Sequence, residues 1–345
     1  MKTIFIYFIA ILFFSCNKTS NVVRENAEIK FSDDDFKLSR KIYGEFVQKV
    51  NDSLLNPGTP YIIGDYLILR KKKSEKLFSV IRITDEEYLG DYMNTGRGPG
   101  EGLYAWRYFT SEEGNLGVYD VKLKKIVEFN LDSLLMKNEF LKEYQLPSYV
   151  LSSDGVFKSR NKIYFNNIYG NTSHFLYSAD LDGNNLKGYG KLPMLDNRFL
   201  NLKLNLVDVF NVNMDNYNQI AAFSYSKIPL LKVFNLENKK LIDIAGPANY
   251  IPNAKDLSFR SKQFYKTIQV TEKYIYALYS GQDWIADSPL TQNAYTLYCF
   301  SHQGQLIEKL QIDKGIYTFS VYKDSIIYGL GKDIEGTSKL IKFEF

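Results

Sequence analysis

The chain has 345 residues, a formal net charge of +4 at pH 7 and 2 cysteines. This small charge excess gives no support for binding to nucleic acid or to an anionic membrane surface. The 27 tyrosines and 24 phenylalanines are typical of β-structure and supply enough aromatic surface to fill the interfaces between packed sheets.

The N-terminus has the pattern of a secretory signal. Lys2 provides a positive charge, residues 4–14 are all apolar or aromatic, and Ser15-Cys16 follows directly. The apolar run is too short to cross a bilayer of ~30 Å as a helix, but it suits the hydrophobic region of a cleaved signal. Residues 12–16 resemble a bacterial lipobox, although two phenylalanines stand where many lipoboxes have smaller residues. We predict a signal peptide over residues 1–15 and lipid attachment at Cys16; the alternative is an ordinary secretory signal.

Residues 16–38 are predicted to form a lipidated, flexible tether, because the segment from Asn17 to about Asp35 is polar and poor in aromatic residues. Acyl chains on Cys16 would anchor the protein stably in a membrane. They would also leave Cys299 without a disulfide partner, so we expect the hydrophobic core to hold the fold together.

Residues 39–345 are predicted to form an all-β, six-bladed β-propeller. Six times a turn residue precedes a short, mostly apolar run, at intervals of 46 to 57 residues. This is the period of a four-stranded sheet repeated in a ring. A second β-rich run follows each first one, with a polar turn after most of them, which indicates hairpins. The six turn residues are Asp65, Asn115, Asn161, Asn218, Lys273 and Asp324.

Two details complete this prediction. The sixth unit stops at Phe345 after its third strand, and an unpaired sheet edge invites aggregation. The alternating stretch from Leu38 to Val47 is therefore predicted to supply the fourth strand and close the ring. Helical spacing of apolar residues over 131–144 predicts a short helical insertion in the second unit. Two smaller β-domains are the alternative, but no Pro/Gly/Ser-rich linker separates the repeats.

The second unit carries a family resemblance. The Gly-rich loop from Gly96 to Glu101 leads to a turn at Asn115, a strand that ends in Asp120 and a strand that ends in Phe129. This succession resembles an NHL-type propeller repeat. Together with the lipobox, it makes the chain similar to TolB-like six-bladed β-propeller lipoproteins of Gram-negative bacteria. The resemblance implies a propeller fold and an envelope location. We predict lipid anchoring in the outer membrane, with a periplasmic or a surface orientation left open. It implies no particular activity.

Candidate binding residues lie on one predicted face. In a four-stranded meander, the loops between the second and third strands and the loops between blades share a face. Loops 96–101 and 280–294 both fall there, and functional groups of β-scaffolds gather on such loops around the channel mouth. The candidates are Arg97, Glu101, Asp283, Trp284 and Asp287. For Arg97 and Glu101 the competing interpretation is structural, with the glycines serving an interblade turn.

The remaining motifs give little support for a catalytic or metal site. Trp106 begins a predicted strand and is expected to pack between blades. His174 and His302 are expected on opposite faces, which argues against a shared zinc site. The Ser320-x-x-Lys323 motif is expected in a strand rather than on the helix that acyl-transfer enzymes use. No metal site or cofactor is predicted, although a divalent cation in the channel remains open.

These observations favour a non-enzymatic binding or scaffold module, lipid-anchored in the envelope, whose loops engage a protein or extracellular ligand. The expected partners are this ligand and the membrane, reached through the N-terminal acyl chains. The alternative is a propeller hydrolase or lyase that acts on a sugar, lactone or peptide with a channel-bound divalent cation. Three or more convergent Asp, Glu or Asn side chains at the channel mouth would favour the enzyme.

Overall fold

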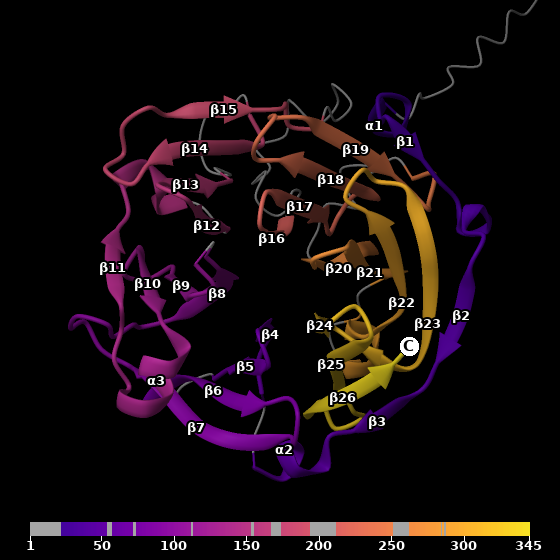
Figure 1. The fold of residues 1–345 in the computed structure, drawn as a ribbon. Helices are drawn as coiled ribbons and strands as arrows, with labels where there is room; N and C mark the ends of the chain where they lie inside the picture. The colour runs from indigo at the N-terminus through magenta and orange to yellow at the C-terminus, as the bar shows by residue number, and fades with distance from the viewer. Residues whose placement is uncertain are drawn as a thin grey trace, which may run out of the picture.

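The computed structural model describes residues 22–53, 57–71, 74–111, 113–152, 155–166, 174–193, 212–250, 262–283, 285 and 288–345. Their strands form six sheets around a central axis (Figure 1). The fold is therefore the predicted all-β, six-bladed propeller.

The first three blades each consist of four consecutive antiparallel strands, ordered from the channel outward. Blade one contains β4 (Pro60–Ile63), β5 (Tyr66–Arg70), β6 (Lys76–Arg82) and β7 (Glu87–Asn94). Blade two contains β8 (Ala105–Thr110), β9 (Leu116–Asp120), β10 (Lys125–Phe129) and β11 (Lys142–Gln145). Blade three contains β12 (Val156–Ser159), β13 (Lys162–Phe165), β14 (Leu176–Asp180) and β15 (Lys187–Tyr189).

The other three blades begin in the same way. Blade four contains β16 (Val212–Tyr217), β17 (Ile220–Tyr225), β18 (Leu230–Asn235) and β19 (Leu241–Ala245). Blade five contains β20 (Lys262–Val270), β21 (Tyr274–Asp283), β22 (Ala294–Ser301) and β23 (Leu306–Ile316). Blade six has only three local strands: β24 (Thr318–Tyr322), β25 (Ile326–Lys332) and β26 (Ser338–Glu344).

Residues 22–53, which we call the N-terminal strap, run around the outside of blades four to six (Figure 1). Its β1 (Ile29–Lys30) pairs in parallel with β19, and its β2 (Ser39–Ile42) pairs in parallel with β23. Its β3 (Gly44–Phe46) pairs antiparallel with β26 as the fourth strand of blade six. The strap thus covers the outer edges of three successive sheets. The dependence of ring closure on β3 remains a prediction.

The strap corrects the predicted tether over residues 16–38. Phe31 is fully buried and Phe36 is 7% exposed. The Phe31 ring centroid lies 5.4 Å from that of Tyr298 and 5.5 Å from that of Phe300, both on blade five. The tether prediction is therefore wrong for residues 29–36, because two aromatic side chains in a polar segment dock on an aromatic surface of blade five. Cys16 lies outside the described residues.

Short helices connect some of the strands. The strap contains α1 (Val22–Glu25), the 3-10 helix η1 (Asp33–Asp35) and α2 (Gln48–Ser53). Further 3-10 turns are η2 (Ser148–Ser152) and η4 (Pro289–Gln292). No helix in the described parts of the chain combines the length and the apolar character that a membrane crossing requires.

The helix α3 (Leu131–Lys137) confirms the first half of the predicted insertion. The Asn130 side chain caps it by accepting a hydrogen bond from the Ser133 N–H at 3.1 Å. Asn138 ends it in a left-handed conformation at φ 54°. The rest of the prediction is wrong, because residues 142–145 form β11 and pair with β10.

Local sequence explains the second and third strands of each blade. Turns before the second strands use residues that tolerate positive φ, such as Gly64 at 54° and Asn218 at 49°. Every residue of β9 and β10 is buried. Neighbouring blades cover both faces of these strands, so apolar residues predominate in them. The buried Lys125 and Glu128 of β10 pair with Glu143 and Lys158.

The hydrophobic core is divided among the interfaces between blades. One buried cluster joins blade one to blade two, and another joins blade six to blade one. The strap adds Phe31 and Phe36 to the cluster of blades four and five, Ile42 to that of blades five and six, and Val47 and Val50 to that of blades six and one. The strap is therefore part of the core as well as of the sheet edges.

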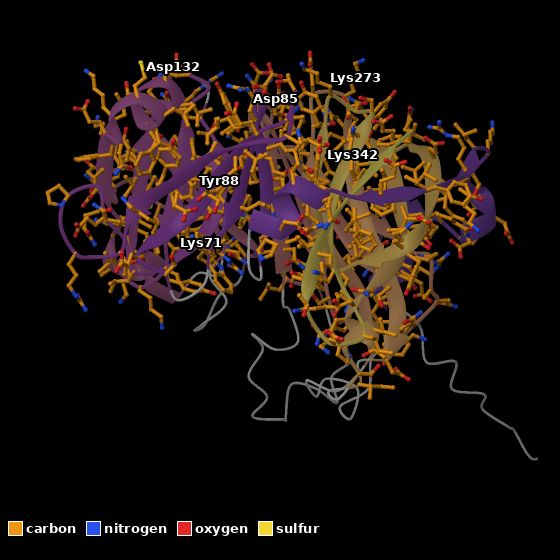
Figure 2. The ribbon with its side chains drawn as sticks, turned by 90° about the horizontal axis from the view of Figure 1, so that it is seen from below. Lys71, Asp85, Tyr88, Asp132, Lys273 and Lys342 are labelled. Carbon is orange, nitrogen blue, oxygen red and sulfur yellow. The ribbon has the colours of Figure 1, made fainter. Side chains whose placement is uncertain are left out.

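The two faces of the ring follow from strand order. Figure 2 shows Asp85, Asp132 and Lys273 at one edge of the ring, whereas Lys71 lies toward the other. Asp85 and Asp132 belong to connections between third and fourth strands, and Lys273 to one between first and second strands. Lys71 follows a second strand. We call the side of Lys71, where the interblade loops also lie, the loop face.

Candidate functional site at the channel mouth

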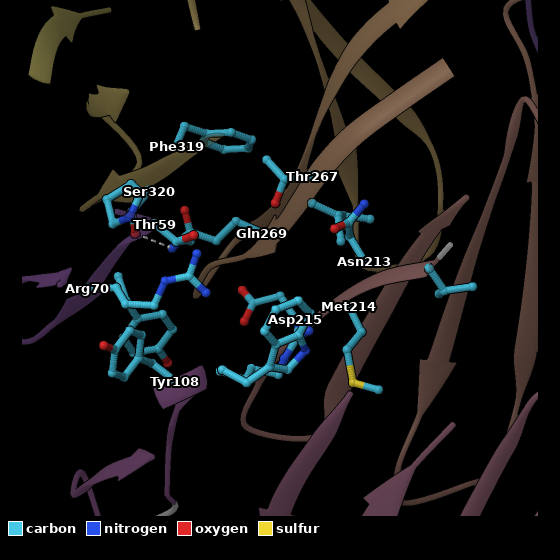
Figure 3. Close-up of a pocket in the computed structure, with 16 residues that line it drawn as sticks. Thr59, Arg70, Tyr108, Asn213, Met214, Asp215, Thr267, Gln269, Phe319 and Ser320 are labelled. Atoms are coloured by element: carbon cyan, nitrogen blue, oxygen red, sulfur yellow. Dashed lines mark hydrogen bonds between the residues drawn. The ribbon is translucent and has the colours of Figure 1, made fainter. Parts of the chain in front are cut away.

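The central channel contains a cavity of about 380 Å³ (Figure 3). Its lining comes from five inner strands, β4, β8, β16, β20 and β24, and from the end of β5. Thr59 and Pro60 lie where β4 begins, and Arg70 is the last residue of β5. Both positions belong to the loop-face ends of these strands, so the cavity lies at the loop-face mouth of the channel.

Of the described residues that line the cavity, three carry charge at neutral pH: Arg70, Arg107 and Asp215. They come from blades one, two and four. Figure 3 shows the Arg70 guanidinium and the Asp215 carboxylate directed into the cavity. The ring therefore assembles two cations and one anion that are far apart in the sequence.

Aromatic rings hold the Arg70 guanidinium. Its Cζ lies 5.5 Å from the ring centroid of Tyr104 and 5.8 Å from that of Trp106, which are cation–π distances. Its Nε is buried and has no hydrogen-bond partner within the described part of the chain. Buried polar groups normally have a partner, so leaving this donor unbonded costs free energy.

Arg107 and Asp215 carry opposite charges that are both desolvated and attract each other. Burial raises the pKa of Asp215 to about 6, although attraction to Arg107 and a 2.8 Å hydrogen bond from the Val270 N–H both favour the carboxylate. Burial lowers the pKa of Arg107 to about 10, and Asp215 opposes this shift. Arg107 Nε is a second buried donor without a partner among the described residues.

Two neutral polar side chains of the lining, those of Gln269 and Ser320, form hydrogen bonds within the protein. Gln269 Nε2 donates to Ser320 Oγ at 3.0 Å, and Ser320 Oγ also accepts the Ile62 N–H at 3.1 Å. These bonds join blades five, six and one. Ser320 lies in β24, so the strand prediction for this motif is confirmed. Lys323 Nζ instead pairs with Asp65 at 2.9 Å, beyond the end of β24, so the two residues do not form a catalytic unit.

The predicted Gly-rich loop is braced by carboxylates. Glu101 accepts a hydrogen bond from the Gly98 N–H at 2.8 Å. Glu143 accepts one from the Gly100 N–H at 2.9 Å and also pairs with Lys125 Nζ at 2.8 Å. Because of these contacts, Glu101 holds the loop in shape, as the structural interpretation expects. Its neighbour Arg97 is exposed. A ligand-binding role for Arg97 and Glu101 stays a prediction.

The second predicted loop is described only in part. Asp283 is the exposed last residue of β21. Trp284 and Asp287 lie outside the described residues, so their binding roles stay predictions. His174 lies in the connection before β14 and His302 in the turn after β22. Those connections belong to opposite faces by strand order. In the described ranges, no group of three or more His, Cys, Asp or Glu is placed to hold a metal ion.

Sequence reasoning placed Trp106 wrongly and missed the charged residues of the cavity. Trp106 is 40% exposed and lines the cavity, since one side of the inner strand β8 faces the channel. The sequence does contain a signal for the cavity, namely the charged residues Arg107 on β8 and Asp215 on β16. A charged residue inside a first strand of a blade is a candidate for the channel, because that strand borders it.

The family model described as TolB-like 6-blade propeller-like matches residues 59–324. The chain belongs to this family. No curated protein sequence matches it.

Solved structures with the same fold include a Bacteroides fragilis protein assigned as exported. It has 11% identity and a TM-score of 0.58, and the match covers 92% of this chain and 98% of that one. A DUF4221 family member from Bacteroides vulgatus has 11% identity and a TM-score of 0.58, with 84% and 92% covered. A gluconolactonase of Xanthomonas campestris has 10% identity and a TM-score of 0.46, with 84% and 86% covered. Likeness at these identities shows the fold alone.

Proposed function

We propose that this protein is a non-enzymatic binding module of the cell envelope, anchored in the outer membrane by lipid on Cys16, whose loop face engages a protein or extracellular ligand. The signal pattern of residues 1–16 supports the envelope location, and the assignment of a structurally similar protein as exported agrees with it. The observation that carries the binding role is the cavity at the channel mouth, where the Nε donors of Arg70 and Arg107 are buried and have no hydrogen-bond partner among the described residues.

The charges of the cavity support binding over the alternative of a hydrolase or lyase with a channel-bound divalent cation. Divalent cations such as Ca²⁺ require several oxygen ligands, often carboxylates. Among the described residues that line the cavity, Asp215 is the one carboxylate, and it shares the cavity with Arg70 and Arg107. Two guanidinium groups would repel a divalent cation in so confined a space.

The test is capture of partners from cell membranes by the tagged full chain, followed by mass spectrometry. Trp284→Ala is expected to reduce capture strongly, because interface tryptophans commonly contribute about 2 kcal/mol or more to binding. Asp132→Ala is the matched control, since Asp132 is exposed on the opposite face. A lowered melting temperature for Trp284→Ala, or undiminished capture, would contradict a binding role for Trp284.

A second arm tests the anchor. Cells that express the wild type or Cys16→Ala are labelled with an alkyne fatty acid. The wild type should take up label and stay with the membranes, whereas Cys16→Ala should do neither. An unlabelled wild-type protein would refute lipidation and leave an ordinary secreted protein.

A further inference from the structure

We propose that the channel-mouth cavity binds a small organic acid, a single carboxylate on a ring-shaped body, with the carboxylate held by Arg70 and Arg107. This inference rests on the proposed binding function and names the chemical class of its ligand.

The unpartnered donors identify the charged part of the ligand. Arg70 Nε and Arg107 Nε are buried and unbonded within the described ranges. A guanidinium presents its donors as a rigid planar fork that matches a carboxylate, and such charge-assisted hydrogen bonds are stronger than neutral ones. A bound carboxylate would stabilise two guanidinium groups that are otherwise costly to bury.

The charge balance of the cavity selects a monoanion. Arg70 and Arg107 contribute two positive charges, and Asp215 contributes one negative charge. A single carboxylate neutralises the remaining positive charge. A phosphate monoester carries about two negative charges at pH 7 and would leave an excess of negative charge beside the Asp215 carboxylate.

The walls of the cavity indicate the chemical nature of the uncharged part of the ligand. Tyr61, Trp106, Tyr108 and Phe319 are lining residues, so aromatic surface flanks the two arginines. Aromatic rings pair favourably with other rings in offset or edge-on arrangements. The volume of about 380 Å³ lies near the lower end of small-molecule sites. A compact ring fits these walls better than an extended polymer does.

The experiment is calorimetric titration of the detergent-purified full chain with benzoate, benzamide and phenyl phosphate. Benzamide keeps the shape of benzoate without its charge, and phenyl phosphate adds a second charge. Benzoate should bind with a Kd of about 1 mM or lower, and the other two at least about tenfold more weakly.

Three substitutions are expected to change the affinity for benzoate in opposite directions. Arg70→Gln and Arg107→Gln should each weaken benzoate binding by about tenfold or more, because each removes a charged donor. Asp215→Asn should strengthen it severalfold, because it removes the competing negative charge. Unfolding or general damage to the cavity cannot produce both directions.

Several outcomes would overturn the inference: no saturable benzoate binding up to about 10 mM, equal binding of benzamide, or weaker binding in Asp215→Asn as well as in the arginine variants. If Arg107→Gln does not fold, Arg70→Gln provides the test, because it leaves the buried charges of Arg107 and Asp215 unchanged. Partner capture is measured without benzoate, so failure of the proposed function and failure of the carboxylate site are separate results.

Discussion

Blades one to three and blades four to six repeat the same four-strand pattern but are completed differently. In the first half, each sheet takes all its strands from one continuous stretch of chain. In the second half, the strap supplies the outermost strand of each sheet. Contacts of the strap span great sequence distances: Glu28 accepts the Asp243 N–H across 215 residues, and Arg40 pairs with Glu308 across 268. The same local pattern can therefore yield self-sufficient blades or blades that need a distant segment.

The two halves also contribute differently to the cavity. The arginines come from blades one and two, whereas Asp215 comes from blade four. The site exists only when the ring brings the halves together. Loss of the strap should therefore disturb the carboxylate side of the cavity before the cationic side.

The largest expected effect is loss of the strap. A chain without residues 17–50 lacks Phe31, Phe36, Ile42, Val47 and Val50, all of which are buried. Each such loss costs about 2 to 5 kcal/mol, so the sum exceeds a typical stability of about 5 to 15 kcal/mol. We expect aggregation or no cooperative melting by circular dichroism. A chain without residues 17–21 alone should melt like the wild type. Equal melting of the two truncations would show that the strap is dispensable.

A matched pair of core substitutions compares the halves directly. Phe31 lies in the strap and Phe78 in blade one, and both are fully buried among aromatic rings. Phe31→Ala and Phe78→Ala should each lower the free energy of unfolding by about 3 to 5 kcal/mol, measured by urea denaturation. A loss of less than about 1 kcal/mol for Phe31→Ala alone would mean that the strap docks only loosely.

The pH dependence of benzoate binding tests whether charged residues from the two halves of the ring share one cavity. The Asp215 pKa is about 6, so this carboxyl gains a proton as pH falls from 7.5 to 5. The facing groups do not titrate there, since the pKa of Arg107 is about 10 and that of Tyr61 is raised. Benzoate stays largely ionised, because carboxyl groups titrate near 4. Affinity should therefore rise by severalfold, up to about tenfold, toward pH 5.

The matched control for this titration is Asp215→Asn, which removes the carboxyl that gains the proton. Its affinity for benzoate should be high and nearly independent of pH over the same range. A wild-type affinity that falls toward pH 5 would contradict the assignment of the pH dependence to Asp215.

The smallest expected effect concerns one hydrogen bond between the strap and blade five. Tyr298 Oη donates to Asp33 at 2.5 Å. Tyr298→Phe should lower the free energy of unfolding by about 1 kcal/mol. Tyr322→Phe is the control, since Tyr322 Oη donates to Asp65 at 2.6 Å without involving the strap. A double-mutant cycle of Tyr298→Phe with Asp33→Ala should give a coupling energy of similar size. Zero coupling would show that this hydrogen bond does not contribute to stability.

Much of the ring could be predicted from short stretches of sequence. The strand predicted to end in Phe129 is β10, which ends there, and the turn predicted at Asn161 directly precedes β13, which begins at Lys162. These strands lie between turn residues and are covered on both faces. Their amino-acid composition alone therefore indicates a strand. Residues 142–145 show the limit of this reasoning: their spacing suited a helix, and pairing with β10 made them a strand.

The sequence by itself thus determined the number of blades, the order of strands within each repeat and the face to which each loop belongs, because turn chemistry and apolar runs act over a few residues. Only the tertiary structure decided that Phe31 and Phe36 belong to the core and that Arg70, Arg107 and Asp215 share one cavity. These choices depend on surfaces that exist only after the ring has formed. A polar segment with two aromatic residues has no preferred partner until blade five presents one, and residues 107 and 215 become neighbours only through the blades between them.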